Sequence, residues 1–227
     1  MRKWEELPDF MRTEAVRPYY DILSKKKKSL AAKRVFDIAM ASLLLVLLSP
    51  IMLIIAVAVK LDSKGEIFFR QERVTQYGKI FKIYKFRTMV KDADKLGSQV
   101  TTQNDARVTR IGRFLRKYRL DETAQLLNVL SGDMSFVGTR PEVPKYVERY
   151  TDEMYATLLL PAGITSEASI MYKDEEKLLA EAVSADDVYV NHVLPQKMEF
   201  NLKNIKNFSL LGDIKTAQHT VCAVLDI

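Results

Sequence analysis

Residues 38–59 read IAMASLLLVLLSPIMLIIAVAV, an apolar run that Ser49-Pro50 interrupts near its centre. As a helix with a rise of about 1.5 Å per residue, this run could cross a bilayer core roughly 30 Å thick. Pro50 cannot donate to the carbonyl of Val46, and its ring clashes with that carbonyl. Because the Ser49 hydroxyl can bond a freed carbonyl, a bent helix is tolerable in lipid. We therefore expect residues 35–60 to form a membrane helix that breaks at Ser49 and Pro50.

Basic residues flank this run on both sides. Lysine and arginine mark the cytoplasmic side of a membrane segment. A spanning helix with a proline kink and a re-entrant hairpin that returns to the cytoplasmic leaflet are both open at this point. The flanking cations are Lys25, Lys26, Lys27, Lys28, Lys33 and Arg34 before the run, and Lys60, Lys64, Arg70 and Arg73 after it.

The chain has 227 residues and a formal net charge of +6. Cys222 is its only cysteine, so an intramolecular disulfide is impossible, which suits a reducing cytosol. The apolar run starts too late for a signal peptide and lacks a small-residue cleavage site after it. The basic excess gathers around the apolar run, where attraction to anionic lipid headgroups explains it more simply than nucleic-acid binding. We expect a membrane-bound protein without a nucleic-acid partner.

Two β-rich runs follow the apolar segment. Residues 67–69 and 80–87 are rich in Ile, Phe and Tyr, and a turn signal at 76–79 separates them. This order predicts a short β-hairpin. If 80–87 is a strand, alternate side chains share one face, which then carries two cations among apolar residues. The residues of that face are Phe81, Ile83, Lys85 and Arg87.

Helical spacing dominates the rest of the chain. Residues 111–119 place apolar side chains on one helix face and cations on the other. Such a helix either lies in the headgroup plane of a membrane or covers a soluble core. We expect further helical segments at 124–130, 143–159 and 175–182, amphipathic runs from 194 to the end, and a short helix with a loop within 91–109.

An acidic pair, Asp121-Glu122, follows the basic segment and starts the helix expected at 124–130. Acids at a helix start are ordinary, since Asp is a good N-cap and suits the positive end of the helix dipole. Here, however, the pair lies beside several arginines and a rigid helix holds it. Paired carboxylates can bind a divalent cation, one of them can attack phosphorus, and a helix N-terminus helps to hold a phosphate.

Four cations lie at segment ends that folding could bring to this pair, although each alone is most often a solvated surface charge. The sequence contains no phosphate loop, no dinucleotide-binding glycine turn and no Cys/His metal spacing. The candidates to neutralise a diphosphate are Lys85, Arg87, Arg116 and Arg140.

Six motifs in a fixed order over residues 33–170 resemble the bacterial sugar transferase family, the monotopic phosphoglycosyl transferases. This chain departs from the family pattern at Thr139, where proline is usual, and at 161–166, which lack the family's arginine. The motifs are Lys33-Arg34-Val35-Phe36-Asp37-Ile38, Ser49-Pro50, Phe69-Arg70-Gln71-Glu72-Arg73, Lys82-Ile83-Tyr84-Lys85-Phe86-Arg87-Thr88-Met89, Leu120-Asp121-Glu122, and Gly132-Asp133-Met134-Ser135-Phe136-Val137-Gly138 with Arg140-Pro141.

The resemblance implies a fold, an activity and a location. Family members anchor by a re-entrant helix bent at Ser-Pro and transfer a sugar 1-phosphate from a UDP-sugar to undecaprenyl phosphate with Mg²⁺, releasing UMP. This step begins the assembly of capsule, exopolysaccharide and other surface glycans. We therefore favour the re-entrant hairpin, on the cytoplasmic face of the bacterial inner membrane.

The expected fold is α/β and mostly helical, with a short β-hairpin and interfacial amphipathic helices. It divides into a membrane-surface extension (1–34), the re-entrant helix (35–60), a small cytosolic catalytic domain (61–200) and a C-terminal amphipathic segment (201–227).

The resemblance also implies roles for the site residues. Asp121 would attack the β-phosphorus of the UDP-sugar and form a covalent intermediate. Glu122 would either help Asp121 to bind Mg²⁺ or take the proton of the incoming lipid phosphate. The phosphate groups would be bound by Lys85, Arg87, Arg116 and Arg140.

Two other readings stay open at the level of sequence. A transferase could move an intact sugar or an acyl group onto a lipid without a phosphosugar intermediate, and UDP instead of UMP would then be the nucleotide product of sugar transfer. Alternatively, the chain could be a basic membrane adaptor in which Asp121 and Glu122 only cap a helix.

Overall fold

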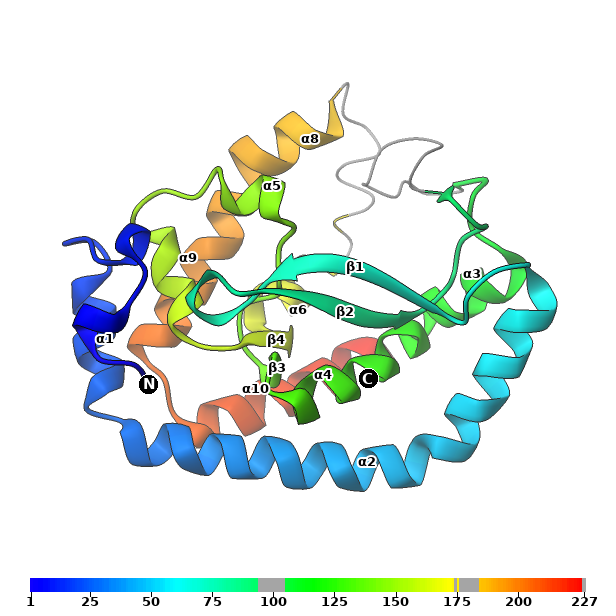
Figure 1. Ribbon diagram of the computed structural model, residues 1–227, viewed down its shortest axis with the longest axis horizontal. Coiled ribbons are helices and arrows are strands. Elements are labelled where there is room, and N and C mark those ends of the chain that lie inside the picture. Colours follow the sequence, from blue (N-terminus) through cyan, green and yellow to red (C-terminus); the bar gives the residue numbers. More distant parts are fainter. Residues whose placement is uncertain (94–104, 174, 176–183, 226–227) are drawn as a thin grey trace.

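One long helix, α2 (Lys27–Asp62), runs along one side of the computed structural model, and the rest of the chain lies on the other side (Figure 1). The structure describes residues 1–93, 105–173, 175 and 184–225. Pro50 lies inside α2, and the Ser49 hydroxyl donates to the Val46 carbonyl at 2.8 Å, as expected. A break at Ser49 and Pro50 was expected, but the structure has one continuous helix, whose C-terminal part turns toward α3 (Arg110–Lys117).

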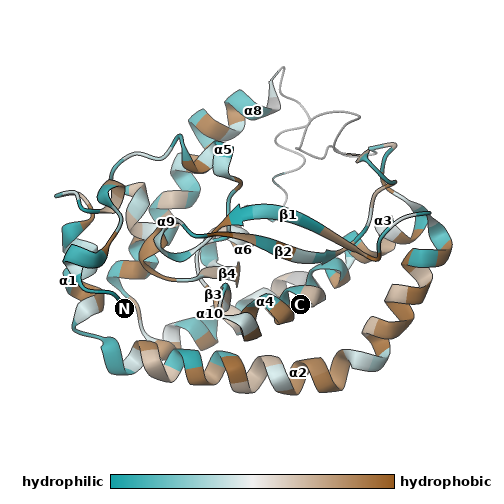
Figure 2. Ribbon diagram, in the orientation of Figure 1, coloured by the Kyte–Doolittle hydropathy of each residue, from teal (hydrophilic) through white to brown (hydrophobic). Residues whose placement is uncertain are grey.

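The middle of α2 is strongly apolar (Figure 2), and many of its large apolar residues are exposed. α2 is long and apolar enough to cross a membrane, and only 11 % of its most apolar window is buried. The core helix of a soluble protein would be mostly buried, so this exposure fits association with lipid. Its exposed large residues include Leu43, Val46, Leu47, Leu53 and Ile54.

The N-terminal part of α2 is bonded to the rest of the fold by charged side chains. Lys33, which is buried, donates to Asp213 at 2.5 Å and to the carbonyl of Val137 at 2.9 Å. Arg34 donates to the last carbonyls of α4 (Leu126–Ser131), and the Asp37 carboxylate accepts from a backbone N–H of β3 (Met134–Val137). The expectation that these flanking cations serve lipid headgroups is therefore wrong for Lys33 and Arg34, because protein atoms take their hydrogen bonds.

The expected β-hairpin is present and accompanied by a second pair of strands. β1 (Phe68–Val74) pairs antiparallel with β2 (Ile80–Phe86), and the 3₁₀ turn η3 (Gln76–Gly78) joins them. β3 pairs in parallel with β4 (Ala162–Thr165), where a Cβ on Gly163 would lie 2.2 Å from a backbone nitrogen of Gly138. Only glycine permits this close approach of two backbones.

Residues 1–34 were expected to be an extension on the membrane surface; the structure shows that they contribute side chains to the protein core, and their position at a membrane stays a prediction. η1 (Trp4–Glu6), η2 (Asp9–Met11) and α1 (Arg17–Ser24) pack on η6 (Met154–Leu159) and α9 (Leu194–Lys206). The expected boundaries at 34/35 and 200/201 fall inside α2 and α9, so neither separates folding units. The buried side chains of this N-terminal part include Leu7, Met11, Val16, Tyr19 and Leu23.

The single helix expected at 143–159 is also wrong. The chain forms α5 (Pro144–Val147), leaves the helical path and re-forms as η6. The reason is packing: Val143, Tyr146 and Tyr150 belong to a cluster with Tyr189, whereas Leu158 packs on the N-terminal segment.

Other helices agree with expectation. The basic amphipathic helix is α3, the helix after the acidic pair is α4, and the C-terminal runs form α9 and α10 (Leu210–Leu225). Residues 94–104, 174 and 176–183 lie outside the described part, so most of the segments expected within 91–109 and 175–182 cannot be compared. The remaining elements are η5 (Leu120–Gln125), α6 (Glu167–Met171), α8 (Ala185–Val188) and the π-helical turn η7 (Tyr189–Val193).

The Lys33–Asp213 pair predicts a large effect on stability. Lys33→Met leaves a buried carboxylate without its cation, which typically costs about 3–5 kcal/mol. Thermal unfolding in detergent should therefore show a marked loss for Lys33→Met and almost none for Lys28→Met, whose side chain is exposed. Adding Asp213→Leu to Lys33→Met should recover part of the loss; no recovery would contradict the pairing.

Candidate active site

Asp121 and Glu122 lie in the first turn of η5, which starts at Leu120, directly after Arg119. Arg119 has φ of +55°, a left-handed conformation that redirects the chain between α3 and η5. Asn128 lies in α4, the helix that follows the pair. Its side chain accepts from the backbone N–H of Tyr84 at 2.8 Å and donates to the carbonyl of Lys82 at 3.1 Å. These bonds fix the acidic turn against β2, the strand that carries Lys85.

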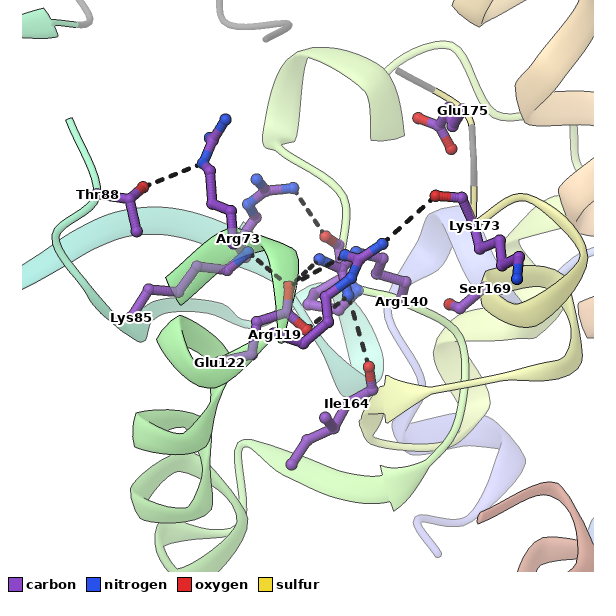
Figure 3. Close-up of polar contacts among 12 residues, drawn as sticks. Arg73, Lys85, Thr88, Arg119, Glu122, Arg140, Ile164, Ser169, Lys173 and Glu175 are labelled. Atoms are coloured by element: carbon purple, nitrogen blue, oxygen red, sulfur yellow. Dashed lines mark hydrogen bonds and ion pairs between the residues drawn. The ribbon is translucent and has the colours of Figure 1, made fainter. Parts of the chain in front are cut away.

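Glu122 is the anchor of a cluster of cations (Figure 3). It accepts a hydrogen bond from Lys85 at 2.9 Å and another from Arg140 at 2.5 Å, and Arg119 lies 3.9 Å away. Burial opposes its charge, but Arg140 and Lys85 overcome this and hold the pKa of Glu122 well below its ordinary value. Glu122 is therefore ionised, and both its oxygens face cations.

Asp121 has a different environment from its neighbour. Its side chain is 7 % exposed, and its Oδ1 has no hydrogen-bond partner among the described residues. Burial raises the pKa of Asp121, while Lys85 opposes that shift. It is also inside the turn, after Arg119 at the cap position, so it is not the helix cap that the adaptor reading requires. A buried carboxylate with a raised pKa and an unpartnered oxygen is typical of functional sites.

A cavity of about 520 Å³ lies in front of this carboxylate. Asp121 lines it, and so do all four cations expected to bind phosphate. A volume of this size is ordinary for a site that takes a small organic ligand. The lining cations from the expected set are Lys85, Arg87, Arg116 and Arg140.

The four cations differ in how they are held. Hydrogen bonds to Glu122 hold Lys85 and Arg140 in place at the cavity. Burial lowers the pKa of Lys85. Arg116 donates to the Thr88 hydroxyl at 3.1 Å. Arg87 lies beyond the end of β2 and donates to the backbone and side-chain oxygens of Ser63, which follows the last residue of α2. Arg87 therefore also secures the C-terminal end of α2, a contact that strand alternation did not indicate.

Sequence reasoning missed a second group of polar residues on the cavity wall. Apart from Arg73, which belongs to the motif at 69–73, no quoted motif contains them, and they come from segments far apart in the chain that meet only in the folded protein. One signal was available: charged or hydroxyl-bearing residues inside amphipathic segments, which the structure places in the cavity. They include Arg73, Glu142, Tyr146, Tyr189 and Lys197.

Among the described residues, Asp121 offers a buried, unpartnered oxygen as a ligand for a hard metal ion. Among the residues that the structure describes, no cluster of three or more His, Cys, Asp or Glu side chains could hold a metal. Mg²⁺ is usually held by one or two carboxylates together with substrate phosphates and water. The unpartnered oxygen of Asp121 fits this pattern, whereas Glu122 could join only by giving up a bond to Lys85 or Arg140.

Comparison with known proteins identifies the family. The bacterial sugar transferase family matches residues 28–226, and the chain therefore belongs to it. A UDP-N-acetylgalactosamine-undecaprenyl-phosphate N-acetylgalactosaminephosphotransferase of Aeromonas hydrophila is 38 % identical over 85 % of this chain and 43 % of its own length. A UDP-glucose:undecaprenyl-phosphate glucose-1-phosphate transferase of Escherichia coli strain K12 is 40 % identical over 83 % of this chain and 39 % of its own length.

A third relative matches a smaller part of this chain but a larger part of its own length. A putative undecaprenyl-phosphate N-acetylgalactosaminyl 1-phosphate transferase of Bacillus subtilis is 42 % identical over 60 % of this chain and 75 % of its own length. The chain spans about two fifths of the length of the Aeromonas and Escherichia relatives.

The raised pKa of Asp121 predicts that this residue costs stability at neutral pH. Below its ordinary value of 3.8, Asp121 is protonated in both folded and unfolded chains. As the pH rises, Asp121 loses its proton in the unfolded chain first. The folded state therefore loses stability until the pH exceeds the pKa of Asp121 in the folded chain. Asp121→Asn should therefore melt at a higher temperature than wild type at pH 7, with a smaller gap at pH 4.5. Asp152→Asn, at an exposed position, is the control; equal melting of Asp121→Asn and wild type at pH 7 contradicts the prediction.

Proposed function

We propose that this protein transfers a sugar 1-phosphate from a UDP-sugar to undecaprenyl phosphate, releases UMP and so starts the assembly of capsule, exopolysaccharide or another surface glycan. One observation carries the proposal: the buried Asp121 carboxylate, with an oxygen that no described residue binds, lines a cavity together with four cations. The names of the relatives from Aeromonas and Escherichia describe reactions of this class, which supports the proposal.

In the proposed reaction Asp121 is the nucleophile. One of its carboxylate oxygens bonds to the β-phosphorus as the bond from that phosphorus to the bridging oxygen breaks, and UMP leaves with the electron pair. An oxygen of undecaprenyl phosphate then attacks the same phosphorus and releases Asp121, giving an undecaprenyl diphosphate sugar. The covalent intermediate divides the meeting of two anionic substrates into two steps. Lys85, Arg116 and Arg140 offset the negative charge in each step.

Glu122 supports the reaction through the cations it holds. Its low pKa makes it a weak base while Lys85 and Arg140 are bound to it. The geometry therefore favours a positioning role over the transfer of a proton from the lipid phosphate. Through Glu122, two cations stay beside Asp121 before any substrate arrives, so little reorganisation is needed when phosphate charge enters the cavity.

The proposed cofactor is Mg²⁺, bound by Asp121 and the substrate phosphates, with Glu122 as a further ligand if one of its cations turns to a phosphate. The ion would supply electrostatic stabilisation to the oxygens of the diphosphate. Its support here is the hard oxygen of Asp121 that lacks a protein partner among the described residues.

The proposed location is the cytoplasmic face of the bacterial inner membrane, with α2 as a re-entrant anchor among anionic lipids. The support is that α2 is bonded to the same folded part of the chain near both ends: through Lys33 to Asp213, and through Asp62, whose carboxylate accepts from the backbone N–H of Ile111 at 3.0 Å. A helix that crossed the membrane would separate these contacts by the full bilayer. The UDP-sugar is then available on the cytosolic side.

The proposed reaction predicts that UMP is the nucleotide product and that Asp121→Asn is inactive. Purified protein with undecaprenyl phosphate, Mg²⁺ and a panel of UDP-sugars should release UMP, and EDTA should stop it. Asp121→Asn should lower UMP release by at least about four orders of magnitude, since the nucleophile is gone. Asp152→Asn is the matched control. UDP as product would favour a glycosyl transferase, and full turnover by Asp121→Asn would refute the nucleophile assignment.

The re-entrant anchor predicts that Pro50 controls topology. Pro50→Ala restores a helical donor and removes the ring clash, so some molecules should straighten and span. In a Cys222→Ser background, single cysteines at either terminus should be protected from an impermeant reagent applied outside the cell. Pro50→Ala should expose one of them in part, whereas Leu53→Ala should not. Labelling of either terminus in the parent protein contradicts the anchor.

A further inference from the structure

The second group of polar residues on the cavity wall is a connected hydrogen-bond network. The Tyr189 hydroxyl donates to Glu142 at 2.5 Å and accepts from Lys197 at 3.3 Å. Lys197 also donates to Glu175 at 2.9 Å and lies 3.9 Å from Glu142. We call these four residues the polar network; they come from the loop after β3, from η7, from α9 and from the described residue at 175.

The polar network faces the same cavity as Asp121. All four of its members line that cavity. Figure 3 shows Glu175 and Lys85 on opposite sides of Arg140. The cavity therefore has one region rich in cations beside Asp121, and another where carboxylates, a phenol and an amine are joined.

The charge of the network does not suit a phosphate. Two carboxylates are balanced by Lys197 and by Arg73, which donates to the carbonyl of Pro141 beside Glu142 and to Gln71. The region is thus about neutral, whereas the region near Asp121 carries an excess of cations. A diphosphate therefore prefers the Asp121 region, where its charge is offset.

The chemistry of the network suits hydroxyl groups. Carboxylate oxygens accept hydrogen bonds from hydroxyls, a lysine ammonium donates to them, and a phenol oxygen whose proton is donated elsewhere can accept from them. Burial raises the pKa of Tyr189 well above its ordinary value, and Glu142 adds to the shift, so the phenol keeps its proton. A hexose is a neutral group with several hydroxyls that each donate and accept.

The burial of these polar side chains argues against a role that is only packing. Lys197 is 5 % exposed, Glu142 is 6 % exposed and Tyr189 is 4 % exposed. Burying charged groups carries a desolvation penalty that well-packed apolar residues would avoid. Buried charges at the wall of a ligand cavity are instead typical of a binding site, where they give orientation and specificity.

We infer that Glu142, Tyr189, Lys197 and Glu175 bind the hydroxyl groups of the donor's hexose while its diphosphate lies against Asp121 and the cations. This inference rests on the proposed function, because it takes a nucleotide-diphosphate sugar as the ligand. It makes the polar network the part of the chain that selects among UDP-sugars.

The test compares binding of UDP with binding of a UDP-sugar. Calorimetry on the full chain in detergent with Mg²⁺ gives Kd for UDP, UDP-glucose and UDP-N-acetylgalactosamine. Tyr189→Phe removes only the hydroxyl that joins Glu142 to Lys197. Its Kd for the tighter UDP-sugar should rise on the order of tenfold, as expected for one hydrogen bond in a charged network, while Kd for UDP stays unchanged.

A matched control separates binding from packing. Tyr150→Phe alters a buried tyrosine of the same apolar cluster that does not line the cavity, and it should leave every Kd unchanged. An equal loss of UDP and UDP-sugar affinity in Tyr189→Phe overturns the inference, because the network then holds the nucleotide. Unchanged affinity for both also overturns it.

A second variant decides the question if Tyr189→Phe fails to fold. Glu175→Gln alters the partly exposed edge of the network, where thermal unfolding should be little affected. The same selective loss of UDP-sugar affinity is expected, and its absence refutes the inference. UMP release by wild type is scored separately: a wild type that binds UDP-sugars selectively but releases no UMP fails the proposed reaction and leaves the sugar site standing.

Discussion

The fold depends on α2 being bonded to one folded body at both of its ends. Near its start, Lys33 is paired with Asp213 of α10, and Arg34 donates to the last carbonyls of α4. At its other end, Arg87 donates to Ser63, and Asp62 accepts from the first turn of α3. The 36 residues of α2, about 54 Å of helix, are thus fixed along one side of the domain. Their apolar face stays available to lipid while the polar chemistry lies on the other side.

The fold gives two adjacent carboxylates opposite electrostatic environments, so that their pKa values shift in opposite directions. Glu122 is ionised because Lys85 and Arg140 face it, and Asp121 has a raised pKa because burial leaves one oxygen without a partner among the described residues. The two groups are neighbours in the chain, so only the direction of each side chain separates them. Pairs of acids with pKa values pushed apart are a common way to assign different tasks to one chemical group.

The sequence was a good guide where local rules act alone. Spacing and turn chemistry predicted the β1–β2 hairpin, the basic helix α3 and the helix α4 that ends before Gly132. It failed where distant segments compete for the same residue. The cations at 33 and 34 belong to the fold because carbonyls and a carboxylate from elsewhere in the chain reach them. Arg87 lines the cavity as expected and in addition donates to Ser63. The interruption between α5 and η6 has the same origin, since its two halves pack on different clusters.

By itself, the sequence determined the apolar run with its central Ser-Pro, the acidic pair and the candidate cations, because each is a property of residue type and short-range order. Only the tertiary structure decided that residues 1–34 contribute to the core and that Glu142, Tyr189 and Lys197 meet at one cavity. It also decided that cations bind the carboxylate of Glu122, whereas one oxygen of Asp121 has no partner among the described residues. The physical reason is that burial and long-range hydrogen bonds set the charge and direction of a side chain. Both depend on segments that are brought together only when the chain folds.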